Sequence, residues 1–154
     1  MSGKLSKRVT LFTGGGFAGM IFRGNTVSYC KTAFGEYELW EFNRIDGNLF
    51  SNIFRVFDTK RQFSDTVING NAFDKIDYTL AKDGWGEHAD SEMKNKEWTA
   101  ITISQQCDRV NISGNSGTTE VALNFKNVNR PVDVYIDLSG MEGEIEFNYY
   151  NASA

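Results

Sequence analysis

Residues 8–22, RVTLFTGGGFAGMIF, decide how the rest of the chain is interpreted. The stretch begins with a short apolar segment, passes through three consecutive glycines, and ends with an aromatic residue, a fourth glycine and a second apolar segment. Two local structures fit this pattern: a nucleotide-binding turn at the start of a helix, and a glycine-rich corner between two β-strands. The choice between them sets the expected fold class.

The run from Gly14 to Gly19 matches the G-x-G-x-x-G pattern of nucleotide-binding turns. Such turns need a helix that begins at the last glycines, because its first N–H groups bind the pyrophosphate. Here Gly24-Asn25 interrupts the chain a few residues later, and β-branched residues follow at once. No alternation of strands and helices appears further along, so the pattern favours the β-corner.

Short strand patterns separated by turn signals recur along most of the chain. The turn signals include Gly24-Asn25, Asp46-Gly47-Asn48 and Asn69-Gly70-Asn71. Between residues 132 and 138, apolar and polar side chains alternate, which indicates one buried and one wet face. We therefore predict an all-β chain that forms an antiparallel Greek-key β-sandwich.

The spacing Phe12-x4-Phe17-x-Gly19 resembles the aromatic-x4-aromatic-x-Gly motif of βγ-crystallin Greek-key domains. This resemblance covers at most residues 8–80. It implies that the first two strands form a hairpin folded over the sheet, with the glycine at a positive φ and the aromatic rings packed across the corner.

The same family carries an acidic or amide pair, two further residues and then two hydroxyl residues before its fourth strand, and this segment holds calcium. Residues 47–52, GNLFSN, resemble it through Asn48 and Ser51, whereas Gly47 and Asn52 depart from it. The resemblance therefore implies a calcium site at Asn48 and Ser51, since oxygen ligands suit this cation.

Residues 82–97 form the most polar stretch and mark a boundary between two parts of the chain. We predict a crystallin-like half over residues 1–82. Residues 98–154 are expected to add further antiparallel strands, packed on the first half as one domain.

Composition excludes several classes of function. The net charge is −4 and the basic residues are scattered, so nucleic-acid binding is not expected. No apolar run is long enough for a membrane span or a signal peptide. Cys30 and Cys107 lie 77 positions apart, which indicates two reduced thiols rather than a disulfide framework. We expect a cytoplasmic protein, with export by a route without a signal peptide as the alternative.

Two residues of the polar stretch are candidates for other chemistry. His88 is the only histidine, and any catalytic pair with a cysteine would have to use it. Trp85 is flanked by glycine residues, and an exposed indole there could stack on a sugar ring. The more ordinary interpretations are a solvated loop histidine and a tryptophan that anchors the loop.

These features predict a non-enzymatic binding or structural module that self-associates and binds calcium, of the structural or cell-adhesion type. A carbohydrate-binding, lectin-like protein that uses Trp85 is the first alternative, so the expected partner is a second copy or a carbohydrate or protein surface. A small hydrolase that uses His88 is the second alternative.

Overall fold

The computed structural model describes residues 10–12, 18–35, 42–60, 62–73, 93, 95–126, 128 and 130–148. Every strand pairing among these residues is parallel. The strands are β1 (Thr10–Phe12), β2 (Ile21–Arg23), β3 (Thr26–Ser28), β4 (Thr32–Gly35), β5 (Asn43–Asp46), β6 (Leu49–Ser51), β7 (Arg55–Asp58), β8 (Gln62–Asn69), β9 (Ala72–Phe73), β10 (Thr99–Ser104), β11 (Gln106–Ser113), β12 (Ser116–Lys126), β13 (Val132–Ile136) and β14 (Met141–Asn148).

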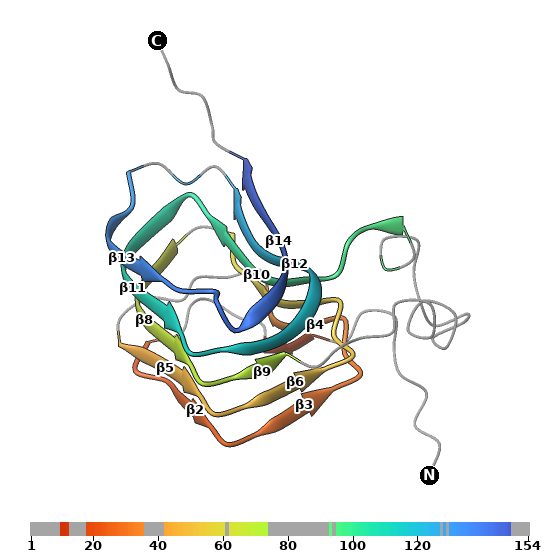
Figure 1. The fold of residues 1–154 in the computed structure, drawn as a ribbon. Coiled ribbons are helices and arrows are strands. Elements are labelled where there is room, and N and C mark those ends of the chain that lie inside the picture. Colours follow the sequence, from red (N-terminus) through yellow and green to blue (C-terminus); the bar gives the residue numbers. More distant parts are fainter. Residues whose placement is uncertain are drawn as a thin grey trace.

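The chain winds in coils, and each coil lies directly on the one before it (Figure 1). One sheet has the order β13-β11-β8-β5-β2. The other runs from β1 through β4, β7 and β10 to β12, and from β12 back through β9 and β6 to β3, while β14 also pairs with β12. Stacked parallel coils of this kind are a β-solenoid. Strands β2 and β3 lie at one end of it, and β13 and β14 lie at the other (Figure 1).

The predicted antiparallel Greek-key sandwich is therefore wrong, and so is the resemblance to βγ-crystallins. The all-β prediction itself is correct. Gly19 does have a positive φ, of 67°, but it lies just before β2 at a corner of the first coil rather than in a folded hairpin. Gly14, Phe17 and the other residues of the 13–17 segment lie outside the described residues.

A Gly-Asn pair forms the same corner in four successive coils. The glycines Gly24, Gly47, Gly70 and Gly114 all have φ between 63° and 67°, a conformation that residues with a Cβ rarely adopt. The asparagine that follows each glycine comes 23 residues after the previous one in the first three coils and 44 residues after it in the fourth. The longer interval arises because the segment between β9 and β10 belongs to that coil.

The asparagines form a ladder that joins the coils. The Oδ1 atom of Asn71 accepts hydrogen bonds from the main-chain and side-chain N–H groups of Asn48, both at 3.0 Å. Its Nδ2 atom donates to the carbonyl of Ile45 at 2.9 Å and to Oδ1 of Asn115 at 3.0 Å. Asn48, Asn71 and Asn115 are buried, so the ladder supplies the hydrogen bonds that a turn inside the protein would otherwise lack.

Phenylalanine rings stack along the interior in the register of the strands. Phe34 packs on Phe57 at 4.8 Å between ring centroids, and Phe50 packs on Phe73 at 5.5 Å. All four are buried. Large rings in the same column of a parallel stack exclude water from the interior, and this burial is the main source of stability.

Trp98 connects the segment before β10 to the solenoid. Its ring is buried against the edge of Phe54, with centroids 5.7 Å apart, and its Nε1 atom donates to the carbonyl of Met93 at 2.9 Å. Arg55 stacks its guanidinium on the other ring of the pair, 4.7 Å from the centroid of Phe54. Within the described part of the chain, no helix reaches the length and apolarity that a membrane crossing requires.

The ladder predicts a strong dependence of stability on its central member. Replacement of Asn71 by alanine removes hydrogen bonds to two neighbouring coils and leaves buried amide groups without partners, at about 1–3 kcal/mol for each unsatisfied group. We expect Asn71→Ala to lower the free energy of unfolding by ~3–5 kcal/mol in urea titrations. Asn25→Ala, at the exposed end of the ladder, should cost about 1 kcal/mol. Equal losses for the two variants would contradict this role.

Candidate functional site

The residues predicted to bind calcium have different surroundings in the structure. The side chain of Asn48 is buried in the ladder, where its Oδ1 atom accepts from the main-chain N–H of Asn25 at 2.8 Å and its Nδ2 atom donates to the carbonyl of Phe22 at 2.8 Å. Ser51 lies on β6 and is only partly buried. The amide of Asn48 thus serves the corner of a coil, and the prediction of calcium loses the crystallin resemblance on which it was based.

The other predicted site residues, Trp85 and His88, lie outside the described residues. The lectin-like alternative assumed a sandwich whose loops hold a carbohydrate, and the chain forms no such sandwich, so this basis is gone as well. Among the residues that the structure describes, no three His, Cys, Asp or Glu side chains gather in a way that could hold a metal ion.

Cys30 and Cys107 are free thiols, and both are buried in the core. Burial raises the pKa of Cys30 to about 11. Burial, with a smaller contribution from the charge of Asp108, raises the pKa of Cys107 to about 12. A thiol that remains protonated and buried is a poor nucleophile, so both cysteines act as small apolar core residues.

These thiols predict a loss of stability in alkali. The thiols of the folded state keep their protons to a higher pH than those of the unfolded chain, which titrate near 9.0. The free energy of unfolding therefore keeps its full value below pH 9 and falls as the pH rises toward 11. The expected slope is on the order of 1 kcal/mol per pH unit for each thiol. Urea titrations at pH 8, 9 and 10 measure it, with Cys30→Ala/Cys107→Ala as the control. A slope that persists in the control would show that other groups cause it.

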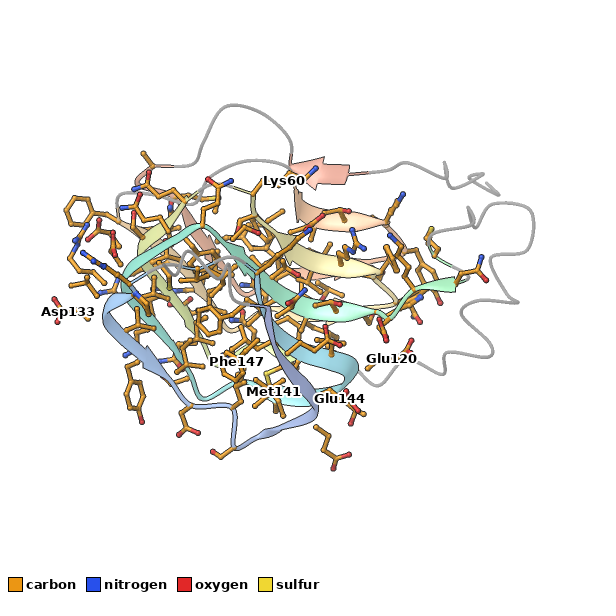
Figure 2. All side chains as sticks on the ribbon, turned by 90° about the horizontal axis from the view of Figure 1, so that it is seen from above. Lys60, Glu120, Asp133, Met141, Glu144 and Phe147 are labelled. Carbon is orange, nitrogen blue, oxygen red and sulfur yellow. The ribbon has the colours of Figure 1, made fainter. Side chains whose placement is uncertain are left out.

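The most unusual surface of the described chain is its last coil. Ile145 and Phe147 on β14 continue the inward-facing columns of Leu123 and Phe125. Leu123 and Phe125 are buried, but Ile145 and Phe147 are 50% and 54% exposed. Side chains at positions that are buried in the preceding coil are therefore half exposed to solvent in the last one. Figure 2 looks onto this end, with Phe147 and Met141 inside the outline of the coil and Asp133 outside it.

A hollow of about 330 Å³ opens beside these residues. It lies between the ends of β12 and β14 and the side of β13, and it is lined by Phe125, Val128, Pro131, Val134, Ile136 and Phe147. Since all six side chains are apolar, the hollow suits an apolar side chain better than a polar ligand.

Two more apolar side chains, Val132 and Tyr135, are at least half exposed on β13. The strand forms the edge of the five-stranded sheet, so its outer main-chain groups face away from the paired strands. The charged residues of the last coil itself all have one sign. Residues 131–154 contain no Lys or Arg and five acidic residues, Asp133, Asp137, Glu142, Glu144 and Glu146.

The first coil differs in charge and in how far its interior is covered. Val27 on β3 is buried, and Phe22 on β2 is partly buried against the core. Outside the core, Ile21 is 66% exposed at the other edge of the five-stranded sheet. Between residues 18 and 35, the charged residues are Arg23 and Lys31, and none is acidic. The two ends of the molecule thus carry opposite charge.

Comparisons with known proteins give no match: no family model matches the chain, and no curated protein or solved structure is significantly similar to it. The assignment to the β-solenoids therefore rests on the strand pairing described above.

Sequence reasoning missed the two end coils as a site. The alternation in residues 132–138 correctly placed Val134, Ile136 and Leu138 on the inward face and Tyr135 on the opposite one. It also placed Val132 on the inward face, but this side chain is 50% exposed. What it could not give was the exposure of the inward residues Ile145 and Phe147, because this depends on their place in the last coil. The opposite charge of residues 18–35 and 131–154 was available in the sequence as a signal.

Proposed function

We propose that the protein is a non-enzymatic structural module that self-associates through the open end formed by β13 and β14. The observation that carries this proposal is the exposure of inward-facing apolar side chains, Ile145 and Phe147, beside an apolar hollow. Exposed contiguous apolar surface on a folded protein is typical of an interaction site.

The strand edges support the same proposal. A parallel edge strand offers a row of N–H and C=O groups on which another strand can pair. Edge strands that avoid pairing usually carry lysine, proline or a strong bulge. The strands β13 and β14 contain neither lysine nor proline, and β13 pairs with β11 without a register shift, whereas the pairing of β14 with β12 contains two. Their acidic residues would repel an acidic partner but would attract a basic one.

The apolar side chains at this surface supply part of the free energy of a specific contact. Complete burial of a large apolar side chain contributes ~1.5–3 kcal/mol, so covering a half-exposed one contributes about 1 kcal/mol. Val132, Tyr135, Ile145 and Phe147 are each at least half exposed. Together these four side chains contribute about 4 kcal/mol, which corresponds to a dissociation constant of about 1 mM, so micromolar association also requires main-chain hydrogen bonds along the edge, at ~0.5–1.5 kcal/mol each.

This proposal predicts concentration-dependent association that depends on Tyr135. We expect sedimentation velocity of the full chain to show species larger than a monomer as the concentration rises from about 1 to 100 μM. Tyr135→Glu adds a carboxylate to the outward face of the β13 edge, and it should raise the dissociation constant at least ~10-fold. Since this side chain faces outward and is 57% exposed, thermal unfolding should change little.

The matched control is Asn111→Glu, which places the same charge on the same outward column one coil earlier, at an exposed position. Its association should resemble that of the unmodified protein. A chain that remains monomeric over the whole concentration range would refute the proposed function.

A further inference from the structure

We propose that the open end binds the opposite end of a second copy, so that β13 of one molecule pairs with β2 of the next in a head-to-tail stack. This inference rests on the self-association proposed above and specifies its partner surface. The occupant is a second copy of this chain, and three observations support it: charge, the side-chain columns of the five-stranded sheet, and strand direction.

Charge opposes a symmetric dimer, in which two copies meet through their last coils. Two copies that met through their last coils would bring five carboxylates against five others, with no Lys or Arg in residues 131–154 to compensate. The first coil has the opposite character, because Arg23 and Lys31 are the only charged residues between 18 and 35. A head-to-tail stack therefore joins an acidic end to a basic end.

The columns of the five-stranded sheet show which side chains would meet. One outward column runs Ile21, Arg44, Val67, Asn111 and Tyr135 through the five strands. Its two terminal members are apolar and are 66% and 57% exposed. If the next copy continues the sheet in register, its Ile21 lies on Tyr135, and the exposed apolar side chain at each edge covers the other.

A second column brings opposite charges together in the same register. Within one molecule, Arg23 on β2 binds Asp46 on β5, with Nε–Oδ1 2.6 Å and Nη2–Oδ2 3.0 Å. That column continues through Asn69 and Ser113, and Asp137 lies next to Ser113 because its N–H donates to the carbonyl of Ile112 at 2.8 Å. In the stack, Arg23 of the next copy lies between Asp137 and its own Asp46.

Strand direction is also compatible with this arrangement. All described strands pair in parallel, and two copies stacked head to tail have these strands parallel, so β2 meets β13 in the same way that β5 meets β2. The arrangement has one steric consequence. Strand β14 takes the position beside β4 of the next copy that β1 occupies in a single molecule, so β1, with three residues and two paired positions, must leave β4.

The first experiment identifies which edges meet. Ile21→Cys and Tyr135→Cys are made as separate variants, one of them isotopically labelled, and the native Cys30 and Cys107 are too buried to compete. Under mild oxidation, we expect a disulfide-linked heterodimer when the two variants are mixed, and much less of any homodimer from either variant alone. Asn111→Cys, which is exposed one strand before Tyr135 in the same column, is the control and should not cross-link to Ile21→Cys.

The other outcomes are equally informative. Cross-linking of Tyr135→Cys to itself would show that two acidic ends meet, which overturns the head-to-tail arrangement but leaves self-association in place. Association in the ultracentrifuge without any cross-link between positions 21 and 135 would also overturn it, because another surface would then be responsible. Absence of association altogether would refute the proposed function itself.

The second experiment tests whether opposite charge draws the two ends together. It leaves unchanged the two columns of the five-stranded sheet, those of Tyr135 and Asp137. Glu142→Lys/Glu144→Lys reverses two exposed charges of the last coil, and we expect the dissociation constant to rise at least ~10-fold at 50 mM NaCl. Glu97→Lys/Asp65→Lys reverses one charge just before β10 and one on β8, the middle strand of the five-stranded sheet, and should change the dissociation constant less than ~3-fold. For the unmodified protein, association should weaken between 50 and 500 mM NaCl, because salt screens exposed charges. Equal effects of the two double variants would contradict the role of charge.

Discussion

The asparagine ladder is the interaction on which the rest of the structure depends. A chain that turns sharply inside a protein must satisfy its main-chain groups, and the Gly-Asn corner does this by letting each asparagine bond to its counterpart in the next coil. Because Asn71 bonds to both Asn48 and Asn115, the corners lie directly above one another. Strand register follows from this alignment, and the stacking of Phe34 on Phe57 follows from the register.

The same ladder explains why a long segment can be inserted without disrupting the fold. Asn71 and Asn115 are separated by 44 residues rather than 23, yet their amides are 3.0 Å apart, like those of Asn48 and Asn71. The additional residues leave after β9 and return at β10, where Trp98 packs on Phe54. A solenoid depends on contacts between neighbouring coils, so it tolerates an insertion in one coil as long as the corners remain aligned.

The sequence identified the strands and turns more accurately than their arrangement. The Gly24-Asn25, Asp46-Gly47-Asn48 and Asn69-Gly70-Asn71 turns are all present, and inward alternation is correct for Val134 and Ile136. The error was to read alternation as antiparallel pairing. Most parallel sheets are covered on both faces and show no alternation. Each sheet of a solenoid has one face toward the core and one toward solvent, so its strands alternate as antiparallel strands do. The repeat of Gly-Asn at 23-residue intervals distinguishes the two cases and is visible in the sequence. The exposure of Ile145 and Phe147 is not visible there, because it depends on which coil is last.

In a solenoid, the first and last coils each have a neighbouring coil on one side only. The two ends expose different residues, because they are formed by different parts of the chain. One end of this solenoid has partly covered inward residues, the basic residues Arg23 and Lys31, and Ile21 exposed at the edge, whereas the other has half-exposed Phe147 and five acidic residues. Because the strands are all parallel, a contact between unlike ends repeats the internal pairing, whereas a contact between like ends reverses the strand direction. A contact between unlike ends also leaves a free end on each molecule, so it generates an open chain of copies rather than a closed dimer. Strand direction and the distribution of charge thus favour the same head-to-tail assembly. Together they argue against a symmetric dimer of like ends more strongly than either does alone.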